Sequence, residues 1–432
     1  MKIPWIPLVL GSGALLALLG GFLSWELQVK AEFFTPKQSG NQAEMNHSNQ
    51  RRIANANTVD PQLVQAQTDF GFALFEQLRQ DTPESNVLIS PTSIAIALTM
   101  AYNGAAGETQ AEMAEALRVQ GIDINQVNQA TQALQQHLMD LDPEVELAIA
   151  NSLWVNEKLP VLPEYVDLVE NTFDALVTSL DFTNPTAKDQ INGWVSEQTS
   201  DRITSIVDRI PPEQLLFLIN AVYFKGSWTE AFDESLTEDL PYTLASGTEI
   251  QHPRMRQGGK YLYLETDQFQ AVSLPYGNET LSFEVLLPRE DVDLDTFYEQ
   301  LTSENWQAWM NQMRSRDGHI GLPRFQFEYE ADLIESLKAM GMNEAFEAGQ
   351  ADFSSLTPLE AAINQVKHKT YIDVNEEGTE AAAVTSIGIV ATSAQVDPEP
   401  PFQMVVDRPF FAAIRDRETG TLLFMGTIMD PR

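Results

Sequence analysis

The side chains that could carry acid–base or metal chemistry in this 432-residue chain are five histidines and 62 carboxylates, and no cysteine is present. The histidines never stand at the i, i+4 spacing of a helical zinc site, and the chain has no H-E-x-x-H motif. It has neither a G-x-S-x-G nucleophile elbow nor a lysine-bearing phosphate loop. Without cysteine, disulfides and thiolate chemistry are excluded. We therefore expect no catalytic residue, metal site or cofactor, and an unrecognised extracytoplasmic hydrolase is the alternative from the enzyme class.

The charge of the chain limits its partners. Aspartate and glutamate outnumber lysine and arginine by 62 to 26, which gives a net charge of −36. Nucleic acid and anionic membrane surfaces both attract positive charge, so we expect neither as a main partner. An apolar fraction of 43% is sufficient for a large packed core. We interpret the acidic excess as a surface that favours solubility.

A long stretch of small residues near the C-terminus does not look like core. It follows an apparent strand at 371–374, contains no basic residue between Lys369 and Arg408, and ends in the proline-rich segment 397–401. Consecutive prolines remove hydrogen-bond donors and fix φ, so this end cannot be regular structure. A connection of more than twenty residues is far longer than ordinary loops and is usually functional or disordered. We expect an exposed loop at about 376–401; a flexible connector is the alternative.

The elements that position this loop are predicted from caps and periodicity. An oxygen-bearing cap before proline marks helix starts at Asp60-Pro61, Ser90-Pro91 and Asn184-Pro185, and Gly341 ends a fourth helix at 331–340. Apolar runs predict strands at 215–224, 281–287, 405–414 and 422–428, and a charged turn at 415–420 joins the last two as a hairpin. Helices cluster early and strands late, which predicts an α+β fold in one large domain.

The N-terminal residues do not belong to this domain. Lys2 precedes an uncharged stretch from Ile3 to Trp25, the pattern of an export signal, and the stretch is also about long enough to span a bilayer, which takes roughly 20 residues. We expect residues 1–31 to be a signal peptide or membrane anchor, 32–57 a polar flexible linker, and 58–432 the folded domain. The domain is expected to work outside the cytoplasm, secreted or anchored through residues 3–25.

Five motifs, in order along the chain, resemble the serpin family of serine protease inhibitors. One of them is the stretch of glutamates, glycine, threonine and alanines at 376–383, which resembles the hinge of the serpin reactive loop. The others are similar to the family's early helix start, the turn after it, the central-sheet strand and the C-terminal signature, at 86–94, 104–109, 219–228, and 406–411 with 424–427. The resemblance implies a serpin fold, with a large central β-sheet, additional β-sheets, about eight to nine helices and an exposed reactive-centre loop.

The resemblance also implies a mechanism. A target serine protease would cleave the loop and form an acyl-enzyme, and the freed loop would insert as a strand into the central sheet. The implied hinge comprises Glu376, Glu377, Gly378, Thr379, Glu380, Ala381, Ala382 and Ala383. By the period of two, Thr379, Ala381, Ala383 and Thr385 share the face to be buried, and all are small and uncharged. Glu380 and Val384 fall on the opposite face, which we expect to face solvent.

Family spacing puts the scissile bond fourteen residues after Gly378, between Thr392 and Ser393, with Ala391 as the alternative. The bait is then Ile389, Val390, Ala391 and Thr392. A trypsin-like pocket selects a basic side chain, and none is present here. Small apolar bait instead suits elastase-like or subtilisin-like serine proteases, and a papain-like cysteine protease less well. A non-inhibitory serpin, a carrier or chaperone, is the alternative function within the family.

A second group of residues is implied to permit the sheet to open. By the resemblance, Ser90, Ser93, Asn220 and His368 form a polar cluster beneath the sheet, where hydrogen bonds can be exchanged as strands part. Trp228 matches the tryptophan where the loop first enters, and plain core packing is the other interpretation of this residue. We expect a monomer whose partner is the target protease, in a covalent acyl complex.

Overall fold

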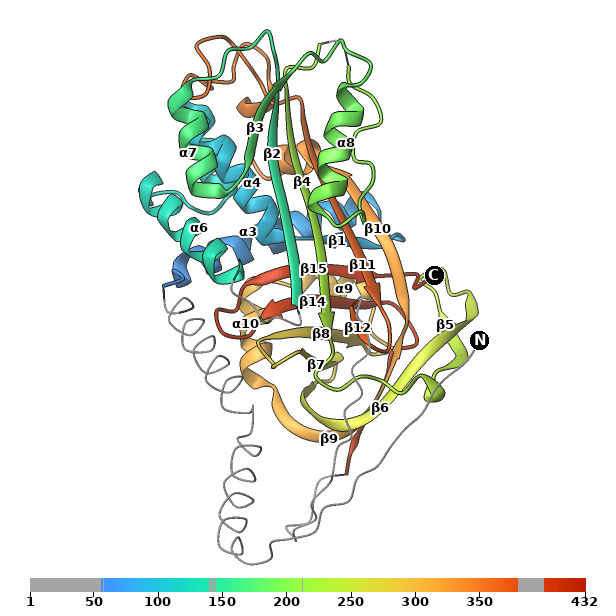
Figure 1. Cartoon of the computed structure of the whole chain (residues 1–432). Coiled ribbons are helices and arrows are strands. Elements are labelled where there is room, and N and C mark those ends of the chain that lie inside the picture. Colours follow the sequence, from blue (N-terminus) through green and yellow to red (C-terminus); the bar gives the residue numbers. More distant parts are fainter. Residues whose placement is uncertain (1–55, 57, 140–141, 143–144, 212, 380–399) are drawn as a thin grey trace, which may run out of the picture. The chain divides into compact units, whose positions relative to one another are not determined.

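The computed structural model describes residues 56, 58–139, 142, 145–211, 213–379 and 400–432. The predicted export segment, nearly all of the predicted linker and residues 380–399 of the predicted loop lie outside the described residues. No helix in the described part of the chain is both long and apolar enough to cross a membrane. Nine α-helices and two β-sheets make up the described part, which confirms the α+β prediction (Figure 1).

The six-stranded sheet has the strand order β10-β11-β12-β4-β2-β3. Its members are β10 (Phe325–Asp332), β11 (Gln365–Val374), β12 (Gly378–Thr379), β4 (Leu216–Ser227), β2 (Val145–Asn156) and β3 (Leu176–Leu180). The predicted strand at 215–224 is β4, and its almost continuous burial arises because both faces are covered. On one face lies α4 (Pro91–Gly104), which contacts β4 and β2, and on the other α8 (Ala187–Gln198), which contacts β2 (Figure 1).

The second sheet has nine strands in the order β1-β15-β14-β8-β7-β6-β9-β13, with β5 paired to β6. They are β1 (Val87–Ile89), β15 (Leu422–Ile428), β14 (Phe410–Asp416), β8 (Leu281–Pro288), β7 (Phe269–Tyr276), β6 (Glu249–Glu265), β9 (Arg314–Pro323), β13 (Phe402–Val405) and β5 (Glu238–Thr243). The hairpin prediction is confirmed, because β14 and β15 pair antiparallel across the charged turn.

The prediction of one strand at 405–414 was wrong. The chain forms β13 up to Val405, leaves the sheet, and returns as β14 from Phe410 onward. The two strands take different partners, since β13 pairs with β9 and β14 with β8 and β15. Pro409 has no N–H for a ladder bond, which explains why the apolar run is interrupted there.

Proline-led caps begin two of the helices as predicted, whereas α8 begins at Ala187, two residues after the predicted Pro185. Asp60 accepts a hydrogen bond from the Gln62 N–H at 2.8 Å and caps α3 (Pro61–Asp81), and Ser90 stands at the cap position of α4. The predicted helix at 331–340 is shorter, because β10 continues to Asp332 before α11 (Ile334–Ala339) begins. The remaining helices are α5 (Gly107–Ala116), α6 (Ile124–Met139), α7 (Pro163–Phe173), α9 (Leu294–Glu299) and α10 (Ser303–Gln312), with short 3-10 turns η1 (Glu234–Leu236) and η2 (Glu344–Phe346).

Candidate functional site

The centre of the six-stranded sheet is a seam between β4 and β11. The two strands run parallel and pair in register from Phe217↔Gln365 to Tyr223↔Tyr371. Beyond that point they part, and β12 lies between them, antiparallel to both: Thr379 is opposite Gly226 on β4 and Val374 on β11. The first residues of the predicted loop therefore already form a strand inside the sheet.

The expectation that the loop is exposed from residue 376 was wrong for its first four residues. Glu376, Gly378 and Thr379 are buried and Glu377 is half-buried. Backbone bonds hold them, because the Phe232 N–H donates to the Glu376 carbonyl at 2.8 Å and the Trp228 N–H to the Glu377 carbonyl at 3.0 Å. These four residues are therefore part of the folded core and not of an exposed loop.

The Glu376 side chain is a buried ionic anchor with 2% exposure. Arg324 donates its Nε–H to both carboxylate oxygens, at 2.7 and 2.6 Å, and its Nη2 lies 2.5 Å from Oε2. The Thr237 hydroxyl donates a further hydrogen bond to Oε1. A buried carboxylate needs such partners, since an unpaired one would be very costly. The hinge interpretation of Glu376 is therefore favoured over that of a solvated charge.

Gly378 and Thr379 fit their positions closely. Gly378 has φ +156°, and a Cβ there would lie 2.1 Å from the Gly226 carbonyl oxygen, so only glycine lets the chain approach β4. The Thr379 hydroxyl is fully buried and hydrogen-bonds the Tyr276 hydroxyl at 2.6 Å. Burial raises the pKa of Tyr276 well above its usual range, so this phenol stays neutral.

Trp228 combines packing with a specific bond. Its ring stacks on Tyr276 with centroids 4.6 Å apart and an interplanar angle of 9°. Its Nε1–H donates to the Asn375 carbonyl at 2.9 Å, directly before the hinge. Core packing and a specific contact at the hinge therefore both apply to Trp228, because the same side chain packs in the core and hydrogen-bonds the residue before the hinge.

The predicted polar cluster lies further along the seam, where β4 and β11 are still paired. His368 is completely buried, and its Nε2 accepts the Ser90 backbone N–H at 3.2 Å. The Nδ1–H therefore donates to Asn220 Oδ1, at 2.6 Å. The Asn220 amide nitrogen donates in turn to the Ser93 hydroxyl and, at 2.6 Å, to Asn151 Oδ1. Burial lowers the pKa of His368 to about 3, so the imidazole is neutral at physiological pH.

The structure brings all four predicted cluster residues together and adds Asn151, which the sequence analysis missed. Asn151 on β2 is directly opposite Asn220 on β4. An asparagine within the mostly apolar stretch 147–155 was the available signal. Ser90 contributes its backbone N–H here, while Ser93 contributes its hydroxyl. Also missed were Arg324, Tyr276 and Thr237, which only the fold places beside the hinge.

The other predicted site residues lie outside the described residues. They are the hinge positions Glu380, Ala381, Ala382 and Ala383, with Val384 and Thr385 beyond them, the bait residues Ile389, Val390 and Ala391, and the predicted reactive bond Thr392–Ser393. The site in the described residues therefore consists of the start of the hinge, the seam and the polar cluster.

The sheet holds two residues of the predicted loop, Gly378 and Thr379, between its central strands β4 and β11, and this arrangement defines a class of protein whose central sheet is open at one end. The comparisons with known proteins identify this class. The family model "Serpin (serine protease inhibitor)" matches residues 65–431, so the chain belongs to the serpin family. Members of this family are mostly inhibitors rather than enzymes.

Several relatives span nearly the same length. Human neuroserpin is 32% identical over 379 residues, covering 85% of this chain and 91% of the relative. The leukocyte elastase inhibitor of Bos taurus is 34% identical and covers 86% and 100%. Among solved structures, the thermophilic serpin tengpin in its native state has a TM-score of 0.80 at 30% identity, covering 86% and 95%. Human thyroxine-binding globulin, complexed with thyroxine, has a TM-score of 0.78 at 27% identity, covering 85% and 98%. The serpin fold prediction is therefore confirmed.

Proposed function

We propose that this chain is a suicide inhibitor of serine proteases, whose loop is cleaved and then inserts fully into the seam between β4 and β11. The observation that carries the proposal is β12, because its two residues already lie in the orientation that the whole inserted strand would need. Insertion continues from β12 without any reversal of chain direction. Each added backbone hydrogen bond nets roughly 1 kcal/mol, so a dozen or so make insertion strongly favourable.

The register of β12 supports the predicted burial of the hinge. Thr379 is opposite Gly226 and Val374, so six residues further Thr385 would come opposite Asn220 and His368. A threonine hydroxyl at that point could take up the hydrogen bonds that Asn220 and His368 exchange when their strands separate. The small side chains of Ala381 and Ala383 would share the buried face with Thr379.

The opposite face of the inserted strand would not be open to water along its whole length. By the same register Val384 would come opposite Ala221, which packs in the apolar cluster that includes Ile191 and Val195 of α8. An apolar valine suits that surface better than a small residue would. Helix α8 would have to yield as the strand passes beneath it.

Insertion from Gly378 to Thr392 would carry an attached protease about 50 Å, at about 3.3 Å for each of the fifteen residues. Displacement on this scale would distort the protease active site before water releases the acyl-enzyme. We propose Thr392–Ser393 as the reactive bond, with Ala391 as the alternative, and an elastase-like or subtilisin-like target. The similarity to a leukocyte elastase inhibitor supports this choice of protease class.

The experiment is to incubate the chain with pancreatic elastase and with subtilisin and to run denaturing gels. We expect a band at the summed mass that survives boiling, and a C-terminal fragment that begins at Ser393. Thr392→Arg should gain trypsin inhibition, and Ala391→Arg is its matched control. A gain with Ala391→Arg alone moves the reactive bond by one residue.

A non-inhibitory serpin is the second candidate, since thyroxine-binding globulin shares the fold and is complexed with thyroxine. Cleavage that leaves the protease fully active would agree with this candidate. The thermal stability of the cleaved chain then separates the two. A rise after cleavage means that the loop inserts and the wrong protease was offered, whereas no rise supports the carrier or chaperone.

We also propose that the domain works outside the cytoplasm, secreted or held by residues 3–25. The support is the sequence pattern of Lys2 followed by an uncharged apolar stretch. Cell fractionation and N-terminal sequencing of the mature chain test the proposal. A new N-terminus near residue 32 indicates a cleaved signal, and an intact chain in the membrane fraction indicates an anchor.

A further inference from the structure

A pocket of about 320 Å³ lies between β5, β6, β9 and β13, at the end of the molecule where the loop returns to the fold. Two large apolar side chains stand exposed at its rim, Leu236 at 49% and Val405 at 41% exposure. Exposed apolar residues that share one hollow are characteristic of a binding surface, whereas scattered ones need no explanation. The rest of the lining includes Arg254, Arg256 and His319.

The lining of this pocket is basic, although the chain as a whole is acidic. The lining contains two arginines and no carboxylate. The four strands around it, β5, β6, β9 and β13, carry five Lys or Arg and five Asp or Glu, so the surroundings are neutral in a chain with a net charge of −36. A pocket lined by arginines in such neutral surroundings can accept a negatively charged group of a partner.

The two arginines differ in how they are held. Arg254 has only 7% exposure, donates one Nη2 bond to the Pro241 carbonyl, and leaves its buried Nε without a partner among the described residues. Arg256 is exposed at the rim and pairs with Glu238, whose side chain is itself 60% exposed. An exposed ion pair of this kind is weak, so a carboxylate from a partner can replace Glu238 at low cost.

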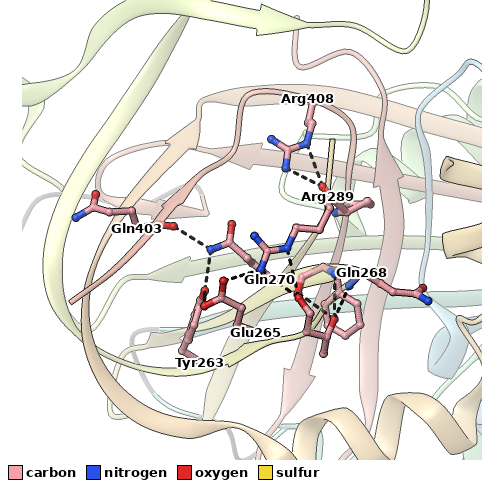
Figure 2. A network of polar contacts seen from close by, with 10 residues as sticks. Tyr263, Glu265, Gln268, Gln270, Arg289, Gln403 and Arg408 are labelled. Atoms are coloured by element: carbon pink, nitrogen blue, oxygen red, sulfur yellow. Dashed lines mark hydrogen bonds and ion pairs between the residues drawn. The ribbon is translucent and has the colours of Figure 1, made fainter. Parts of the chain in front are cut away.

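The rim formed by β13 is fixed in position before any partner binds. Gln270 donates from Nε2 to the Gln403 carbonyl at 2.9 Å and to the Tyr263 hydroxyl at 2.7 Å (Figure 2). Phe402 stacks on the Tyr263 ring with centroids 3.8 Å apart and an interplanar angle of 7°. A surface that is already ordered loses less entropy when it binds a partner.

The pocket lies on the strand that follows the predicted loop. Pro400 is the first described residue after the loop, and its carbonyl accepts a bond from Arg316 of β9 at 3.3 Å. Strand β13, which supplies Val405 to the rim, begins two residues later. A protease that holds the loop in its active site would therefore lie close to this pocket.

We infer that this pocket is a second contact for the target protease, which accepts an acidic side chain beside an apolar one on the protease surface. The identity of the partner rests on the proposed function, whereas the chemistry of the contact rests on Arg256, His319, Leu236 and Val405. The contact raises the rate at which the protease and the loop meet and leaves the later insertion unchanged.

The experiment measures the second-order rate constant of inhibition of subtilisin and of pancreatic elastase by the full chain at low and high salt. Arg256→Glu is expected to lower the rate about tenfold at low salt and less at high salt, because rim charges act mainly on association. Val405→Ser is expected to lower it about threefold at either salt concentration. The number of inhibitor molecules consumed per protease should stay at its wild-type value.

Matched controls lie elsewhere on the molecule. Arg118→Glu makes the same charge change on an exposed arginine just after α5, and Leu359→Ser removes an apolar side chain with 51% exposure. Rates for Arg256→Glu and Val405→Ser within twofold of these controls, with both proteases, overturn the inference. So does a dimer of the wild type that Arg256→Glu dissolves in sedimentation, because the pocket would then serve a second copy of the chain.

A protease whose catalytic serine is replaced by alanine separates this inference from the proposed function. It binds the loop but cannot acylate, so its dissociation constant reports docking alone. A higher dissociation constant for Arg256→Glu than for Arg118→Glu supports a contact between the pocket and the protease, even where the active protease is never trapped. Equal dissociation constants, or no binding to the wild type, overturn the inference whatever the trapping assay gives.

Discussion

The two ends of the β4–β11 seam are in different states. At one end β12 separates the strands, and the Glu376–Arg324 ion pair and the Thr379–Tyr276 bond hold it there. At the other end the strands are still paired directly, above a cluster centred on Asn220 and His368. On the proposed mechanism, insertion would start at β12 and would separate the strand pairs from Tyr223↔Tyr371 onward before it reaches the cluster.

The largest expected effect on inhibition comes from a change at β12, where the two strands are separated. Thr379→Arg would place a charge in a fully buried position beside Tyr276, where no carboxylate partner is found among the contacts of Thr379. The proposed inhibitor should become a substrate, with at least about a tenfold rise in the molecules consumed per protease, which corresponds to about 1.4 kcal/mol. Thr379→Ser keeps the hydroxyl and is the control. Trapping by the arginine variant at the wild-type ratio would disprove this account of the hinge.

At the end of the seam where β4 and β11 pair directly, the stability of the fold should depend on pH through His368. The pKa of His368 is about 3 in the folded chain and about 6.5 when unfolded, so below pH 6.5 only the unfolded state takes up the proton. This contribution to stability is complete above pH 6.5 and is lost as the pH falls toward 3. Between pH 6.5 and 4.5 the loss in the free energy of unfolding is about 2 kcal/mol. Denaturant unfolding of the wild type and of His368→Gln measures it.

His368→Gln is the control for all other titrating groups. Glutamine can accept a hydrogen bond from the Ser90 N–H and donate one to Asn220, but it does not titrate. Its stability should fall less steeply with pH than that of the wild type over this range. Identical slopes for the two proteins would mean that the histidine does not remain neutral in the fold.

A smaller effect is expected from the ion pair that holds the hinge. Glu376→Gln should weaken the anchor by about 1–2 kcal/mol, which is less than a fully buried pair because Arg324 is 42% exposed. A double-mutant cycle with Arg324→Met measures the coupling, and hydrogen exchange of the Thr379 amide reports release of β12. Glu377→Gln, whose side chain takes no part in this pair, is the matched control. A coupling energy near zero would show that the Glu376–Arg324 ion pair does not stabilise β12.

The smallest expected effect tests whether the inserted loop contacts the polar cluster. If Thr385 reaches Asn220 and His368 after insertion, Thr385→Val keeps the shape but loses a hydroxyl, which nets about 1 kcal/mol. The cleaved form should lose that much stability while the uncleaved form is unchanged. Thr385→Ser, which keeps the hydroxyl, is the control. An equal loss in both forms would contradict the proposed register.

The sequence was sufficient to predict what depends on local chemistry or on long motifs. Proline-led caps located α3 and α4, apolar runs located β4 and the β14–β15 hairpin, and the resemblance gathered Ser90, Ser93, Asn220 and His368 into one cluster. These signals lie within a few consecutive residues or in motifs that recur across the family.

Contacts between distant segments could not be predicted in this way. Arg324 stands 52 residues before Glu376, and only the sheet brings the two together. The early burial of Gly378 depends equally on the path of β4, since it is the Gly226 carbonyl that leaves no room for a side chain. In the sequence alone, two adjacent glutamates look like solvent-exposed loop, which is why residues 376–379 were predicted to belong to the exposed loop.

The antiparallel placement of β12 against both neighbours has a consequence for dosage. On the proposed mechanism a molecule that has taken up its loop has no vacant strand position left and cannot return to its starting form, so each copy acts once. The capacity of such a protein is then a matter of supply: the number of proteases it can remove equals the number of intact copies, however tightly each one binds.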